Sequence, residues 1–186
     1  MITLDDDTHF LSKGISRCCY YHPKDHEKCI KVFQSGPQAR PHTITREINE
    51  LKRLGKKQLM GLKVPKYFGS VETNKGQGYV FELIRDMDGT VSQTFKACVE
   101  EDPSQRESLK QSLYEVLLGN APVLSDLNPG NVLIQQTPNA PRFALIEGLG
   151  EKTFINLASI IPFFARKKIK CKFHQFDNHL ERLPNF

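Results

Sequence analysis

The segment from Thr43 to Gly55 constrains the fold most strongly, because an acid lies within the apolar stripe of a predicted helix. The stripe consists of residues at helical spacing: Ile44, Ile48, Leu51 and Leu54. At about 100° per residue it covers roughly a third of the helix circumference and includes Glu47. An unpaired carboxylate is costly to bury. Glu47 therefore either reaches water from the edge of the stripe or pairs with a cation from another element.

The nearest preceding candidate for that cation lies in a predicted strand. Residues 28–33, KCIKVF, alternate Ile30 and Val32 with Lys31. For a single lysine on an alternating strand, the commoner interpretation is a side chain that points out to water. As the partner of Glu47, Lys31 would instead point into the fold.

Strand and helix patterns divide the rest of the chain into two parts. Further strands are predicted at 63–73, 79–84, 131–136 and 142–148. Further helices are predicted at 102–120, with Asp102 as its cap, and from about 156 to 183, interrupted by Pro162. The patterns predict a strand-rich part, 1–84, with one key helix, and a mostly helical part, 85–186, with a short strand pair.

A polar hexapeptide, Asp126-Leu127-Asn128-Pro129-Gly130-Asn131, lies between two short apolar runs. Asn-Pro and Pro-Gly are turn dipeptides, so a hairpin loop is one interpretation. The other is that the loop holds the oxygen atoms of Asp126 and Asn131 at a fixed separation for chemistry, since catalytic groups concentrate on loops. The later strand that ends in Glu147 and Gly148 could present a metal ligand in a similar way.

Composition excludes several classes of protein. The net charge of +5 is mildly basic, which falls short of the charge typical of nucleic-acid binding. The five cysteines include no C-x-x-C pair, which argues against a disulfide framework or a structural zinc site. No signal peptide and no apolar run long enough for a bilayer are evident. We expect a soluble protein of the reduced cytoplasm.

The most basic segment is 166–172, with Arg166, Lys167, Lys168, Lys170 and Lys172. It could contact nucleic acid or a membrane surface, but a solvated helix face is the commoner explanation.

The order of these features resembles the protein-kinase-like fold: strand lysine, helix glutamate, strand, helix, D-x-x-x-x-N and strand-end acid. More narrowly, several segments resemble the bacterial YrbL, or PhoP regulatory network, family. These segments are SRCCYYHPKDHEKCIKV (16–32), REINELKRLG (46–55), VPKYFGSVETNKGQGYVFELI (64–84), LNPGNVLI (127–134) and GLGEKTFI (148–155). The narrower resemblance covers nearly the whole chain, and its specificity comes from the ordered set.

The resemblance implies an α+β, two-lobed fold with a reduced C-terminal lobe and a cleft that binds ATP with Mg²⁺. Lys31 would contact the phosphates, and Glu47 would hold Lys31. The backbone from Glu82 to Ile84 would bind the base.

The same resemblance assigns roles to the second half of the chain. Asp126 would accept the proton of an acceptor hydroxyl, while Asn131 and Glu147 would hold the metal ion.

The chain departs from the kinase pattern at several positions. Residues 11–23 would form the loop that covers the phosphates, but Gly14 is the only glycine of this loop, so Lys13, Ser16 and Arg17 could supply contacts instead. Asn128 stands where kinases have a lysine, and Glu147 stands where they have an aspartate.

Three functions remain open on the sequence. The first is a phosphotransferase that passes the γ-phosphate of ATP to an unidentified hydroxyl acceptor. The second is a pseudokinase that binds nucleotide, or a regulatory protein partner, without transfer. The third is a globular protein with no nucleotide site, in which the order of motifs is a coincidence.

Overall fold

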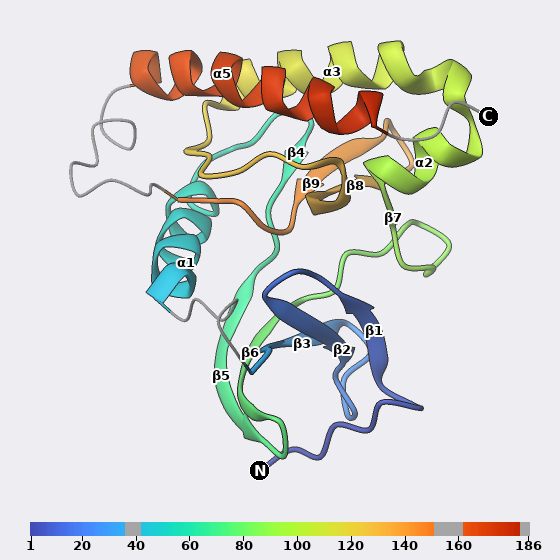
Figure 1. The fold of residues 1–186 in the computed structure, drawn as a ribbon, viewed down its shortest axis with the longest axis vertical. Coiled ribbons are helices and arrows are strands. Elements are labelled where there is room, and N and C mark those ends of the chain that lie inside the picture. The colour runs from blue at the N-terminus through green and yellow to red at the C-terminus, as the bar shows by residue number, and fades with distance from the viewer. Residues whose placement is uncertain (36–41, 151–161, 183–186) are drawn as a thin grey trace.

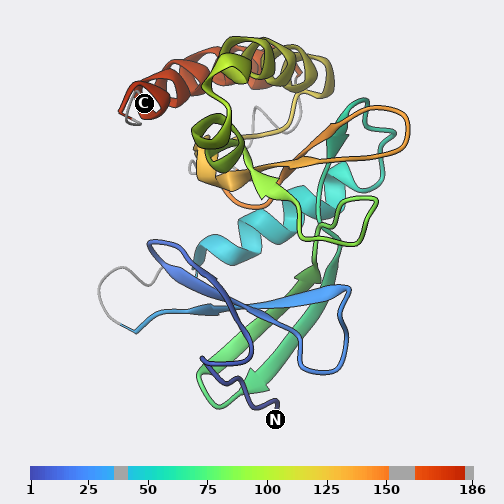
Figure 2. The same ribbon diagram turned by 90° about the vertical axis from the view of Figure 1, so that its right-hand side faces the viewer.

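The computed structural model describes residues 1–35, 42–150 and 162–182, which form two sheets with helices beside and between them (Figures 1 and 2). The first sheet has the order β1-β2-β3-β6-β5, and the second has the order β4-β9-β8-β7. Helix α1, His42–Leu54, lies between the two sheets in Figure 2. This arrangement is the expected α+β, two-lobed fold.

The first sheet is antiparallel throughout and carries the strand of Lys31. Its strands are β1 Phe10–Lys13, β2 Arg17–Tyr21, β3 Lys28–Phe33, β5 Tyr67–Thr73 and β6 Gly76–Glu82. Strands β3 and β6 and helix α1 were predicted from their patterns. The pair β1 and β2 was not, because we had treated residues 11–23 as a loop. The turn is confined to the residues between these strands, where the amide of Gly14 donates to the carbonyl of Arg17 at 2.8 Å.

The second sheet carries the polar hexapeptide and Glu147. Its strands are β4 Leu62–Lys63, β7 Gln93–Thr94, β8 Val132–Gln135 and β9 Arg142–Leu145. The predicted pair β8 and β9 forms a hairpin. The hairpin interpretation of residues 126–131 is wrong, because Leu124 instead makes an isolated bridge to Leu149. The hexapeptide ends in a short 3-10 helix, η2, Pro129–Asn131.

Helices cover the far side of the second sheet. Helix α2 is Phe95–Glu101, η1 is Pro103–Gln105, α3 is Arg106–Asn120 and α5 is Pro162–Glu181. Helices α3 and α5 lie side by side (Figure 1) and contact one another. Asp102 was expected to cap the helix at 102–120, but its side chain accepts from the amide of Ser104 and so caps η1, the turn that leads into α3. The short α2 was missed.

Helix α5 begins at Pro162 in the described part of the chain, and the missing N–H of proline costs nothing in the first turn of a helix. Residues 156–161 of the predicted helical segment lie outside the described residues. None of the helices in the described ranges has the length and apolar character needed to cross a bilayer.

One large apolar cluster holds the parts together and so positions the site. It includes Leu51 and Leu54 of α1, Phe81 of β6 and Phe143 of β9, with Phe176 from α5. Each of these side chains is buried. Because α1 packs in the same core as both sheets, the charged residues on its cleft side are held at fixed positions relative to the second sheet.

Candidate nucleotide-binding cleft

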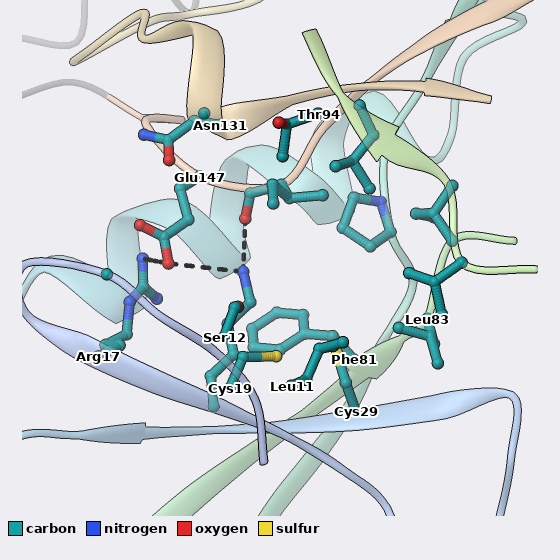
Figure 3. A pocket seen from close by; sticks show the side chains of 18 of the residues that line it. Leu11, Ser12, Arg17, Cys19, Cys29, Phe81, Leu83, Thr94, Asn131 and Glu147 are labelled. Carbon is teal, nitrogen blue, oxygen red and sulfur yellow. Dashed lines mark hydrogen bonds and ion pairs between the residues drawn. The ribbon is translucent and has the colours of Figure 1, made fainter. Parts of the chain in front are cut away.

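A cleft with a volume of about 410 Å³ lies between the two sheets (Figure 3). Its apolar end is lined by Leu11, Cys19, Cys29, Leu83, Val91 and Leu133. Its polar end holds Arg17, Lys31, Asn131 and Glu147. Figure 3 shows Arg17, Asn131 and Glu147 together at one side and Leu83 at the other. This combination of an apolar slot and converging polar groups is typical of a small-molecule site.

A smaller cavity of about 150 Å³ adjoins the cleft. Arg17, Asn131 and Glu147 line both spaces, so they form the junction between them. Asp126 lines only the smaller cavity. The structure therefore brings Asp126, Asn131 and Glu147 to one region, as their order in the sequence had suggested.

Glu47 is buried inside the fold, with 4% of its surface exposed. The interpretation that it reaches water is therefore wrong. The expected pairing with Lys31 also fails, because the partner of Glu47 is Arg17. Nη2 of Arg17 lies 2.8 Å from Oε2 of Glu47, and Nη1 lies 3.4 Å from Oε1. The fork of the guanidinium matches the carboxylate in a bidentate pair, which an ammonium group cannot do.

Lys31 points into the cleft rather than to water, with 5% of its surface exposed. Nζ donates to the carbonyl oxygen of Ile146 at 2.6 Å and lies 3.7 Å from Oε1 of Glu147. The interpretation that Lys31 faces water is wrong. It rested on the alternation along β3, but both faces of this strand are covered. The lysine thus reaches across the cleft from the first sheet to the segment after β9.

The carboxylate of Glu147 forms ion pairs with both Arg17 and Lys31. Its Oε1 lies 3.2 Å from Nη2 of Arg17 as well as near Lys31. Burial alone would raise the pKa of Glu147, but Lys31 and Arg17 outweigh burial and hold the pKa below its ordinary value. Burial would lower the pKa of Arg17, and the two carboxylates raise it instead. Glu147 and Arg17 are therefore both charged in the neutral range of pH.

The loop from Asp126 to Asn131 is tied to the Glu147 turn by backbone hydrogen bonds. The amides of Ser125 and Asp126 donate to the carbonyl of Gly148 at 2.8 and 3.2 Å. The amide of Ile146 donates to the carbonyl of Asn131 at 3.1 Å. Gly148 has a φ of 76°, and a Cβ there would overlap the carbonyl of Asp126. A glycine is therefore required for the two segments to approach so closely.

Asn131 and Glu147 are the residues best placed to hold a metal ion. Figure 3 shows the amide of Asn131 and the carboxylate of Glu147 directed into the same part of the cleft. The ion pairs of Glu147 with Arg17 and Lys31 use Oε1, which leaves Oε2 for a ligand. The described residues contain no cluster of three or more His, Cys, Asp or Glu side chains for a metal. An ion there would need phosphate or water oxygens as well, which is usual for Mg²⁺.

The expected base-binding segment presents two backbone groups on one edge. The amide of Glu82 donates to Lys66, and the carbonyl of Ile84 accepts from Ser92. The carbonyl of Glu82 has the thiol of Cys29 at 4.0 Å. The amide of Ile84 has no partner among the described residues. In extended backbone, groups of residues two apart face the same side. The side chain of Glu82 binds Lys63 instead.

Gly14 and Ser16, the two residues expected near the phosphates, line different spaces. Gly14 lines the larger cleft, whereas Ser16 lines only the smaller cavity. Arg17, which we had named as an alternative contact, proves to be the centre of the charge cluster.

Sequence reasoning missed Glu50, which is also buried on α1. Oε1 of Glu50 accepts from the amide of Val123 at 2.8 Å, and both carboxylate oxygens accept from Arg53. This contact ties α1 to the chain just before Asp126. The signal was present in the sequence, since an acid three residues before an arginine on one helix predicts a pair.

The chain matches known proteins over most of its length. The family model for the PhoP regulatory network protein YrbL matches residues 2–181. The uncharacterized protein YrbL of Escherichia coli is 33% identical over 165 residues, which cover 86% of this chain and 78% of the relative. The relative from Shigella flexneri gives the same values.

Among solved structures, the crystal structure of the PknI kinase domain of Mycobacterium tuberculosis, a double mutant, is similar with a TM-score of 0.52. The identity is 13%, and the match covers 77% of this chain but only 59% of that kinase chain. At this identity the likeness shows the fold alone. The chain has a protein-kinase-like fold and belongs to the PhoP regulatory network protein YrbL family.

Proposed function

We propose that the cleft binds ATP and that the protein passes the γ-phosphate to a small hydroxyl acceptor. The observation that carries this proposal is the pair of adjoining cavities. One is large enough for a nucleotide, and the other holds Asp126. Their junction at Arg17, Asn131 and Glu147 is where a transferred phosphate would pass from donor to acceptor.

The base would occupy the apolar end of the cleft. The carbonyl of Glu82, with the thiol of Cys29 at 4.0 Å, and the amide of Ile84 offer one acceptor and one donor, which suits the edge of adenine. Phe81 and Leu83 belong to the same segment and add apolar contacts. These features support an adenine nucleotide as the ligand.

The phosphates would extend toward the polar end. Lys31 would contact them as a point charge, and Asn131 with Oε2 of Glu147 would hold Mg²⁺. The metal ion would neutralise charge on the transferred group. In the transfer, the bond from the γ-phosphorus to the bridging oxygen breaks and ADP leaves. A new bond forms to the acceptor oxygen, whose proton passes to Asp126.

The second candidate is a nucleotide-binding regulator without transfer. The observation that favours it is the pairing of Glu47 with Arg17, since kinases require the strand lysine to pair with the helix glutamate for activity. Transfer by this chain would have to proceed with Lys31 bound to Ile146 and Glu147, or after an exchange of partners.

Two substitutions separate these functions. In Asp126→Asn, ATP should still raise the melting temperature by mass action, while transfer should fall by about 10² to 10⁴ because a positioned base is lost. In Lys31→Met, both should weaken. The measurements are thermal shift with ATP and release of labelled phosphate or ADP by purified protein.

Each outcome points to one function. If ATP stabilises the wild type but no phosphate is transferred, the protein is a nucleotide-binding regulator. The absence of any stabilisation by ATP, with or without Mg²⁺, would contradict nucleotide binding altogether.

A further inference from the structure

Arg17 is one of two nearly enclosed cations of the cleft, with 6% of its surface exposed. It lies between two carboxylates that come from different parts of the fold. Nη2 is 2.8 Å from Glu47 of α1 and 3.2 Å from Glu147 after β9. Lys31 adds a second cation at 3.7 Å from Glu147. The cluster of Arg17, Lys31, Glu47 and Glu147 therefore carries two charges of each sign and is neutral without any bound ion.

Arg17 also retains an unused donor. A guanidinium has five N–H groups, and its hydrogen bonds to Glu47 use only Nη1 and Nη2. Nε is buried and has no partner among the described residues. Buried donors in proteins are nearly always hydrogen-bonded, so this guanidinium has unsatisfied donor capacity that a ligand beside it could take up. The ligand must accept hydrogen bonds and tolerate a positive charge, which describes a phosphate oxygen.

The position of Arg17 fits that role. It lines both the cleft and the smaller cavity, so it stands where the terminal phosphate would lie. The loop from Asp126 to Asn131 contains no basic residue that could neutralise the phosphate from the other side. Figure 3 shows the guanidinium at the same end of the cleft as Glu147 and Asn131.

We propose that Arg17 is the resident cation of the phosphate subsite, and that the cleft therefore binds a nucleoside triphosphate in its metal-free form as readily as in its Mg²⁺ complex. This inference rests on the proposed nucleotide site. Two bare carboxylates would repel the phosphates, and a divalent ion would ordinarily remove that repulsion. Here Arg17 and Lys31 already do so, and the guanidinium cannot lose its proton. Mg²⁺ then serves transfer rather than binding.

The test compares binding of a non-hydrolysable ATP analogue in chelator and in Mg²⁺, by calorimetry and thermal shift. For the wild type, the two dissociation constants should agree within about threefold. For Arg17→Gln, affinity in chelator should fall by at least about tenfold and recover with Mg²⁺, which can then neutralise Glu47 and Glu147. Arg17→Lys keeps a cation and should remain independent of the metal. Lys75→Gln removes an exposed ion pair with Asp6 at the far end of the first sheet and should match the wild type.

Several results would overturn the inference. A wild type that needs Mg²⁺ for binding would contradict it while leaving the nucleotide site in place, and this comparison requires no variant to fold. Unchanged affinity of Arg17→Gln in chelator would also contradict it. Failure of the wild type to bind the analogue under either condition would remove both this inference and the proposed function.

Discussion

The two walls of the cleft are built in different ways. On the side of the first sheet and α1, Arg17, Lys31 and Glu47 are nearly enclosed and held by ion pairs between side chains. On the side of the second sheet, Asp126 and Asn131 lie in a partly exposed loop held by backbone hydrogen bonds to the Glu147 turn. A substitution that removes a charge should therefore disturb the first wall. A substitution that alters the backbone conformation should disturb the second.

This difference follows from the local structure. Strands and helices already satisfy their own backbone groups, so only side chains are left to join β2 to α1. A loop has unsatisfied amides and carbonyls, and these can bind a neighbouring turn directly. Glu147 belongs to both walls, because its backbone lies in the turn while its side chain enters the charge cluster.

The largest effect is expected from Glu47→Ala. This change leaves Arg17 without its bidentate partner in a buried position, and breaking a buried ion pair typically costs about 3–5 kcal/mol. Chemical denaturation monitored by circular dichroism measures the free energy of unfolding. Glu107→Ala is the control, because it removes an exposed pair with Lys110 on α3 and should cost no more than about 1 kcal/mol. Similar small losses in both variants would mean that side-chain charges do not hold the first wall.

A smaller but more local effect is expected from Gly148→Ala. The backbone conformation alone should cost about 1–3 kcal/mol, because φ is 76°, and overlap with the carbonyl of Asp126 adds to this. Gly119→Ala on α3 is the matched control, since its Cβ meets no atom within 4 Å and alanine favours a helix. Hydrogen exchange should also quicken at the amides of Ser125 and Asp126. Unchanged exchange there would contradict a loop held by the Gly148 turn.

Much of this arrangement could be predicted from the sequence. The fold class came from the resemblance to the protein-kinase-like fold, and that resemblance rested on the order of Lys31, Glu47, Asp126, Asn131 and Glu147. Periodicity identifies elements because it depends only on neighbours along the chain. The hairpin interpretation of the hexapeptide failed because turn dipeptides do not reveal whether the preceding segment pairs with the following one.

The partner of Glu47 could not be predicted in the same way. Lys31 and Arg17 both precede it on strands of the same sheet, and the choice between them depends on the three-dimensional position of β2. That strand was hidden within a segment we treated as a loop. A buried bidentate site favours arginine over lysine, so the chemistry of the acid was a signal that spacing could not supply.

Glu147, which belongs to both walls, should contribute to the loss of folding stability in acid. Glu147 has a pKa below its ordinary value of 4.5 in the folded protein, through Lys31 and Arg17, although burial opposes them. The unfolded chain therefore binds this proton first as the pH falls below about 4.5, and stability is lost until the folded pKa is reached. Glu147→Gln should reduce the slope of unfolding free energy against pH in this window, by at most about 1.4 kcal/mol per unit. Parallel curves for the two proteins would contradict this.

The smallest effect concerns the apolar end of the cleft, where the two walls leave room for the base. Cys19 and Cys29 both line this end, and a hydrogen bond between the thiols raises the pKa of Cys19 and lowers that of Cys29. A bound base would cover both sulfur atoms, so saturating nucleotide should slow their alkylation several-fold. Cys171 on α5 is exposed and should react at the same rate with and without nucleotide. Peptide mass spectrometry after brief treatment with iodoacetamide measures each site. Equal labelling of Cys19 and Cys29 under both conditions, while the nucleotide still raises the melting temperature, would place the base elsewhere and confine the role of the cleft to its charged end.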